Sequence, residues 1–242
     1  MWSDLKDLPP CTVRTSPRAK RVRLRMTMHQ GLLVVLPRSF DRRRLPQVLE
    51  EKRDWINRAT ARMDSRRSAM PGHLLSDRPE RIHLLAVGQA WTVDYLPADG
   101  QRVTLSEQDD HRLVLQGCTN RYDLVRSALR SWGLGKGRDT LLPWLKRLAA
   151  RHGFSYARTT IRAQRSLWGS LSTRGTLSLN CKLLFLPGEL TEYVLLHELC
   201  HTRHLDHGPG FWSLLKQLDP DWERKRKALR GGAWQFVPAW LA

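Results

Sequence analysis

The sequence predicts an α+β protein with a β-rich N-terminal extension, and three observations support this class. Segments that alternate apolar and charged residues, as strands do, occur in the first half of the chain. Segments with apolar residues at helical spacing dominate the region after residue 120. Hydrophobic residues make up 41% of the 242-residue chain, which is enough for a buried core and unlike a disordered protein.

The N-terminal region, residues 1–68, is predicted to form a β-hairpin followed by a helix. Residues 21–28 alternate apolar side chains with arginines, which indicates a half-buried strand with a basic outer face. A turn at Gly31 leads into the apolar run 32–36, which is the second strand. Pro46 lies early in a predicted helix that extends to about residue 62.

Residues 69–118 are predicted to contain a linker and short strands. The polar stretch 64–81 carries two prolines and a glycine, which is typical of a long loop. Strand-like runs follow within 82–96 and 102–116, and the turn-forming sequences PADG and EQDDH interrupt them.

Residues 119–242 form the third predicted region. Helices are predicted over 121–132 and 138–152, with Gly153 as the C-cap of the second. The elements predicted after Gly153 are a strand at 159–164, a hairpin around TRG, a helix over 189–205, a break at 206–210, and two short helices that begin at Pro209 and at Asp219.

The chain is strongly basic, because 41 Lys and Arg residues against 23 Asp and Glu residues give a net charge of +18. Such a surplus indicates nucleic acid or another polyanion as a partner, with a solvated basic surface as the alternative. The four cysteines form no CxxC pair, and the N-terminus has no apolar signal segment, so a reducing, cytoplasmic location is expected. No apolar run approaches the ~18 residues of a membrane span, so no membrane association is expected, and the oligomeric state stays open.

The stretch HELCHTRHLDHGPGFW, residues 197–212, contains four histidines and begins with an HExxH motif. His197 and His201 differ by only about 40° around a helix, so both imidazoles project toward one point. Zn²⁺ is the expected cofactor, because it lowers the pKa of water and polarises a carbonyl. Glu198 is then the expected general base and proton shuttle.

A third metal ligand has to come from outside the HExxH motif, since a catalytic zinc takes three protein ligands. On a continuing helix His204 has the right face, but it lies ~10 Å along the axis from His197, too far to share one ion. His207 follows the break at 206–210, where a turn can bring its side chain back to the metal. His207 is therefore favoured, with His204 or a glutamate from elsewhere as alternatives.

Candidate substrate-binding residues precede the motif. The strand TLSLN, which consists of Thr176, Leu177, Ser178, Leu179 and Asn180, is the candidate edge strand for an extended substrate, with a purely structural strand as the alternative. Arg162 and Arg165 are candidates for binding an oxyanion or an acidic substrate, and surface arginines are the alternative. Tyr193 and Cys200 are expected in the core. The basic run ERKRK at 223–227 contacts nucleic acid or is a solvated face.

The stretch from QRSLWGS to HGPGFW resembles the YgjP-like metallopeptidase family, which has a WGS-containing hairpin, then HELxH, then a His followed shortly by Phe-Trp. The N-terminal segments VLPRSF and EKRDWI are also similar to that family, so the resemblance covers roughly residues 13–230. It implies a zincin-like metallopeptidase core, similar to that of SprT-like proteases that work near DNA.

The resemblance also implies that His197, His201 and His207 are zinc ligands and that Glu198 is the catalytic glutamate. Leu167 and Leu171 stand where the family usually has Arg and Cys, so any function of those two family residues is altered here.

Taken together, these features predict a zinc metallopeptidase that hydrolyses peptide bonds of a protein or peptide substrate. Two other functions stay open on the sequence. One is a nucleic-acid-associated protein with structural zinc, and the other is a hydrolase of nucleotide or phosphate substrates, which suits the basic charge.

Overall fold

The computed structural model describes residues 9, 11–17, 19–27, 31–68, 76 and 78–241. Contacts divide the chain into two compact units, Met1–Pro71 and Gly72–Ala242, and each unit has its own cluster of buried apolar side chains. The architecture is a mixture of helices and sheets, as the sequence predicts. The strands expected within 69–118 belong to the same unit as the C-terminal region.

The first unit contains a three-stranded sheet of β1 (Cys11–Ser16), β2 (Arg23–Thr27) and β3 (Gly31–Pro37) in the order β1-β3-β2. The predicted hairpin is confirmed, since β2 pairs antiparallel with β3; its connection at 28–30 lies outside the described residues. Sequence reasoning missed β1, which pairs parallel with β3.

Two helices pack on this sheet where one was predicted, namely α1 (Leu45–Glu51) and α2 (Arg53–Ser68). The backbone leaves helical geometry at Lys52, with φ −107° and ψ 10°. Leu45, Leu49 and Ile56 are fully buried against β3. Because α2 extends to Ser68, residues 64–68 of the predicted loop are helical, whereas 69–75 and 77 lie outside the described residues.

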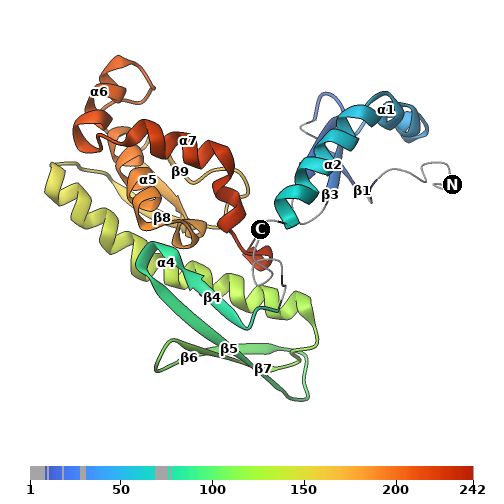
Figure 1. Cartoon of the computed structure of the whole chain (residues 1–242), viewed down its shortest axis with the longest axis horizontal. Coiled ribbons are helices and arrows are strands. Elements are labelled where there is room, and N and C mark those ends of the chain that lie inside the picture. The colour runs from blue at the N-terminus through green and yellow to red at the C-terminus, as the bar shows by residue number, and fades with distance from the viewer. Residues whose placement is uncertain are drawn as a thin grey trace. The chain divides into compact units, whose positions relative to one another are not determined.

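The second unit begins with a four-stranded sheet. It contains β4 (Arg81–Leu84), β5 (Gln89–Pro97), β6 (Val103–Gln108) and β7 (Arg112–Gly117) in the order β4-β5-β7-β6. The long helix α4 (Tyr122–His152) lies between this sheet and the remaining elements of the unit (Figure 1). This helix is therefore the central layer of the unit.

The prediction of two helices in this region is wrong, because α4 is continuous through Gly133, Gly135 and Gly137. One of these glycines, Gly137, is a site of close packing, because a Cβ there would lie 3.0 Å from Ile161 and 3.1 Å from Cys181. At Gly133 a Cβ would make an ordinary contact of 3.6 Å with Trp240. A tertiary contact thus favours glycine at position 137, although the glycines suggest a helix break in the sequence. The helix ends at Gly153, which takes the expected left-handed conformation at φ 65°.

The elements beyond α4 form the layer that carries the histidines. A three-stranded sheet contains β8 (Arg158–Arg162), β9 (Gly169–Leu171) and β10 (Thr176–Asn180), and the short 3-10 helix η3 (Cys181–Phe185) follows. The helices are α5 (Gly188–Cys200), α6 (Pro209–Leu218) and α7 (Trp222–Gly232), followed by η4 (Ala233–Phe236) and η5 (Ala239–Leu241). Among the described residues, no helix is long and apolar enough to cross a membrane.

Candidate metal centre

Helix α5 places His197 and Glu198 in its last turn, and His201 is its C-cap residue. The apolar residues of this helix are buried around the first histidine, so the helix is anchored in the core of the unit. The sequence predicts a helix that continues to residue 205, and this prediction is wrong. The chain leaves the helix after Cys200 and turns through residues 201–203.

The early end of α5 allows His207 to return to the other two histidines. The Nε2 atoms of His197 and His207 lie 3.1 Å apart. The candidate ligand atoms of His197, His201 and His207 all lie within 4.8 Å of one another. Burial, together with the neighbouring histidines, lowers the pKa of His197 to about 3, so its imidazole is neutral and suited to binding a cation.

Phe211 holds the three imidazoles in place. Its side chain is fully buried, and its ring centre lies 4.8 Å from that of His197 and 4.7 Å from those of His201 and His207. Trp212, the next residue, stacks on His207 with ring centres 5.3 Å apart. The Phe-Trp pair of α6 therefore forms a wall behind the histidines.

His204 is outside this cluster, but its backbone carbonyl takes part in the arrangement. The Nδ1 atom of His201 lies 3.0 Å from the carbonyl oxygen of His204. Because a carbonyl only accepts, this contact places a proton on Nδ1, and the neutral tautomer of His201 then presents Nε2 as its acceptor atom. The imidazole of His204 instead packs on Gly210, where a Cβ would lie 2.9 Å from the ring.

Glu198 is buried beside the histidines, with an exposed fraction of 5%. Burial raises the pKa of its carboxyl group to about 8, and its Oε2 atom has no hydrogen-bond partner among the described residues. Gly169 of β9 makes room for this carboxylate, since a Cβ there would lie 2.6 Å from Oε1. The glycine of the WGS sequence is therefore a steric requirement of Glu198.

A cavity of about 370 Å³ opens beside His197, Glu198 and His207. Helix α7 supplies part of its wall through Arg226, Leu229 and Arg230, and Trp168 and Trp212 add aromatic surface; Tyr193, buried as expected, also lines it. The sequence analysis interprets the run 223–227 as a basic patch and does not predict that Arg226 lines this cavity. The helical spacing of Arg226 and Arg230 was the available signal, but nothing local indicates that α7 folds back on α5.

The proposed edge strand is placed differently from the prediction. β10 is the central strand of its sheet, with β8 parallel on one side and β9 antiparallel on the other. Thr176–Asn180 therefore has no open edge, and the prediction of an edge strand is wrong. Leu177, Leu179 and Asn180 are fully buried. The Asn180 side chain donates to the carbonyls of Gln164 and Leu167, so it shapes the preceding loop.

The remaining candidates lie outside the cavity wall. Arg162, at the end of β8, and Arg165 are both exposed and are absent from the lining of this cavity. Leu167 is exposed in the loop before β9, while Leu171 of β9 lines a second cavity, which also contains His201 and Leu205. The departure from the family pattern at Leu171 therefore lies close to the histidines.

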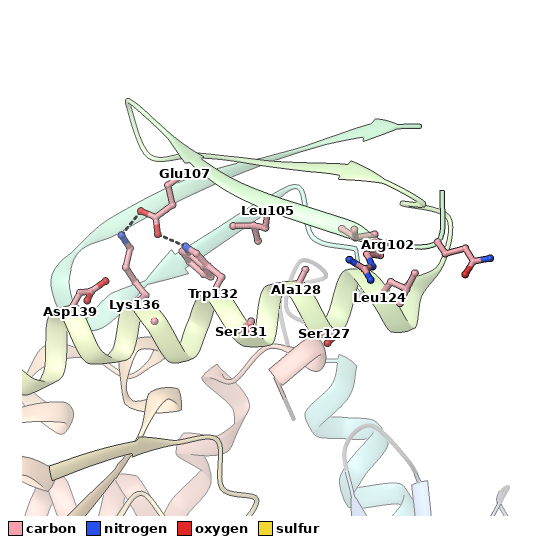
Figure 2. Close-up of a pocket in the computed structure, with 13 residues that line it drawn as sticks. Arg102, Leu105, Glu107, Leu124, Ser127, Ala128, Ser131, Trp132, Lys136 and Asp139 are labelled. Carbon is pink, nitrogen blue, oxygen red and sulfur yellow. Dashed lines mark hydrogen bonds and ion pairs between the residues drawn. The ribbon is translucent and has the colours of Figure 1, made fainter. Parts of the chain in front are cut away.

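A larger cavity of the second unit lies elsewhere, between β6 and α4, with a volume of about 600 Å³. Figure 2 shows that Glu107 is already engaged there: its carboxylate accepts from Trp132 Nε1 at 2.8 Å and from Lys136 Nζ at 2.7 Å. The histidines and Glu198 are not part of its lining.

Converging imidazoles beside a buried glutamate are the features of a metal-dependent hydrolase. A family model described as the YgjP-like metallopeptidase domain matches residues 20–231. The chain therefore belongs to the YgjP-like metallopeptidase family, which the sequence resemblance indicated.

The other comparisons add less. A crystal structure of the metallopeptidase zymogen of Pyrococcus abyssi abylysin is 22% identical, and the match covers 37% of this chain and 91% of that one, with a TM-score of 0.34. No curated protein matches the chain.

Proposed function

We propose that the chain is a zinc-dependent peptidase with a zincin-like core, in which His197, His201 and His207 hold the metal and Glu198 activates water. The observation that carries the proposal is the placement of three converging imidazoles and a buried, partly unpartnered carboxylate at one cavity. Three protein ligands with one open position are typical of catalytic zinc, whereas structural zinc has four.

The donor set fits zinc. Two nitrogens bonded to a tetrahedral zinc lie roughly 3.3 Å apart. The Nε2 atoms of His197 and His207 are separated by 3.1 Å, and the three candidate ligand atoms all lie within 4.8 Å of one another. His201 presents Nε2 because its Nδ1 donates to the His204 carbonyl. Bound zinc supplies a Lewis acid that polarises a peptide carbonyl and makes water more acidic.

Glu198 performs the proton transfers in this proposal. Its carboxylate takes a proton from the attacking water and returns it to the leaving nitrogen of the peptide. The low polarity that raises its pKa also makes it a stronger base once it is ionised. Gly169 keeps the carboxylate at the cavity, because any side chain at that position would displace it.

The substrate strand is reassigned to β9. Among the described strands, β9 pairs only with β10, and its first residue, Gly169, lines the cavity beside Glu198. An extended peptide that hydrogen-bonds to the free edge of β9 is brought to the histidines by backbone contacts alone. This placement suits hydrolysis of unfolded or extended protein segments.

The test compares wild type with Glu198→Gln on unfolded protein, peptide mixtures and nucleoside triphosphates, with bound zinc measured in both proteins. We expect zinc in both and peptide hydrolysis by wild type alone, with a loss of at least about a hundredfold in the variant. Glu192→Gln is the matched control on the same helix, since a glutamine there can still accept from Trp144.

Other outcomes support the rival functions. Zinc-loaded protein that binds nucleic acid and is unaffected by Glu198→Gln would identify a structural metal. Hydrolysis restricted to the triphosphates would identify a phosphate-directed enzyme. Carefully purified protein that takes up no metal would overturn the proposal.

A further inference from the structure

One wall of the cavity beside the histidines is basic. Arg226 and Arg230 are one helical turn apart on α7, and both line the cavity that contains His197 and Glu198. Glu198 is the one carboxylate among the described lining residues. The metal-binding histidines therefore face a wall that carries two permanent positive charges.

Two of the other three cations of α7 are neutralised, and the third, Lys227, is exposed and lies outside the cavity. Arg224 pairs with Glu189 at 2.6 Å, and Lys225 holds the buried Asp219 with both contacts at 2.8 Å. Within the described residues, neither Arg226 nor Arg230 has a carboxylate partner. The helix thus uses Arg224 and Lys225 in ion pairs and leaves Arg226 and Arg230 at the cavity without one.

Arg226 packs on the aromatic residues beside His207. Its guanidinium carbon lies 4.4 Å from the centre of the Trp212 ring, and Trp212 stacks in turn on His207. Among the described residues no group accepts a hydrogen bond from this guanidinium, so its N–H groups are available for an anion. The stack fixes this donor beside a proposed metal ligand.

We propose that Arg226 and Arg230 bind a carboxylate of the peptide substrate next to the scissile bond. The carboxylate comes from an acidic side chain or from the C-terminus of the peptide, and both sources match a planar guanidinium donor. A cavity of about 370 Å³ with Trp168 and Leu229 in its wall has the size and the apolar lining for a side chain. The inference rests on the proposed peptidase function and adds its substrate preference.

The experiment uses zinc-loaded full-length protein and peptides that differ at one position. Each peptide has Glu, Gln or Lys at successive positions around the cleaved bond, and each is made with a free and with an amidated C-terminus. We expect kcat/KM to be about tenfold higher for the preferred carboxylate than for its neutral counterpart, the effect of one charge-assisted hydrogen bond.

Three variants test the assignment to these arginines. Arg230→Gln should remove most of the preference while cleavage of the neutral peptide is retained. Arg230→Glu should reverse it in favour of the lysine peptide. Lys227→Gln is the matched control, because it removes the same charge from an exposed position of α7 outside the cavity and should leave the preference unchanged.

The outcomes separate this inference from the proposed function. If wild type cleaves peptides but treats Glu and Gln alike, or if Lys227→Gln acts like Arg230→Gln, the inference is overturned and the peptidase stands. If wild type cleaves no peptide, fluorescence anisotropy can measure how tightly the same peptides bind to the Glu198→Gln variant. The difference in affinity between the acidic and the neutral peptide then reports the preference for a carboxylate. Tight binding of a single-stranded oligonucleotide that depends on Arg230, without any preference for the acidic peptide, would overturn the inference in favour of nucleic acid.

Discussion

Two cavities of the C-terminal unit, the one between β6 and α4 and the one beside the histidines, differ in how their charged groups are satisfied. In the larger cavity, between β6 and α4, Glu107 accepts hydrogen bonds from both Trp132 and Lys136 (Figure 2). In the smaller one, Glu198 and His197 each have a buried atom without a partner among the described residues. The smaller cavity therefore carries the greater desolvation cost.

The cavity proposed as the site is therefore the one with unsatisfied polar atoms and not the one with the larger volume. A buried polar atom without a partner costs about 1–3 kcal/mol, and folded proteins retain few of them unless a ligand or a reaction uses them. A glutamate that is paired and partly exposed, like Glu107, costs little folding free energy, so it gives no sign of a functional site. Substitutions in the two cavities can test whether the reaction takes place where the polar groups are unsatisfied.

The largest effect is expected for His207→Ala. Loss of one of three ligands should weaken zinc binding by more than the 10–100-fold that is typical for groups behind the ligands, measured by competition with a chromophoric chelator. His204→Ala is the matched control, because it keeps the backbone carbonyl that orients His201 and should change the affinity by less than about tenfold. The reverse order of effects would make His204 the ligand.

A pair of glycine substitutions sharpens the comparison between the cavities. Gly169→Ala introduces a Cβ only 2.6 Å from the Glu198 carboxylate, so we expect peptidase activity to fall by roughly a hundredfold with zinc retained. Gly135→Ala in the larger cavity has no described atom within 4 Å of the new Cβ. It should leave activity unchanged and stabilise α4 by up to about 1 kcal/mol in urea unfolding. Equal activity of the two variants would contradict the proposed role of Glu198.

Sequence periodicity predicts the local part of this site well. His197 and His201 are four residues apart on one helix, and this spacing alone brings their imidazoles together. The return of His207 depends on where α5 ends, and the expected helix was five residues too long. The exclusion of His204 assumes a helix that continues through it, and this premise is wrong because α5 ends at Cys200; His207 nevertheless lies beside His197.

Nonlocal pairing is the part that the sequence could not provide. β10 looks like an edge strand from the hairpin with β9, but β8 pairs with its other side from well upstream in the chain. Arg226 reaches the cavity because α7 packs against α5, and its own segment reads only as basic. The glycines of α4 have low helix propensity, yet the helix is continuous through them, and Gly137 packs closely against Ile161 and Cys181.

Lys182 is a buried charged residue outside both cavities, and its substitution tests whether a buried charge in this protein is always needed for activity. It is 2% exposed, its ammonium lies 5.1 Å from the centre of the Trp234 ring, and burial lowers its pKa to about 8. The unfolded chain, with an ordinary lysine pKa of 10.5, binds more protons between pH 8 and 10.5, so stability rises with pH in that window. Below pH 8 the full penalty, on the order of 3 kcal/mol, is present.

Lys182→Met should therefore stabilise the protein by up to that amount at pH 7, and the gain should fade toward pH 10.5, as urea unfolding at several pH values would show. Peptidase activity should be retained, because Lys182 lines neither of the two cavities. A variant that is more stable but inactive would extend the functional site to this lysine. The unsatisfied groups beside the histidines would then not be the only buried charges that matter for activity among the described residues.

The smallest effect is expected for Glu107→Gln in the larger cavity. Glutamine can still accept the hydrogen bond from Trp132, and the lost ion pair with Lys136 is partly exposed, so the cost should be about 0.2–1 kcal/mol in urea unfolding. Activity should equal that of wild type, in contrast to Glu198→Gln, although both changes replace a carboxylate with an amide of the same shape. If Glu107→Gln instead inactivates the peptidase, the larger cavity takes part in the reaction. The pairing of a glutamate with hydrogen-bond donors would then not distinguish a structural carboxylate from a catalytic one.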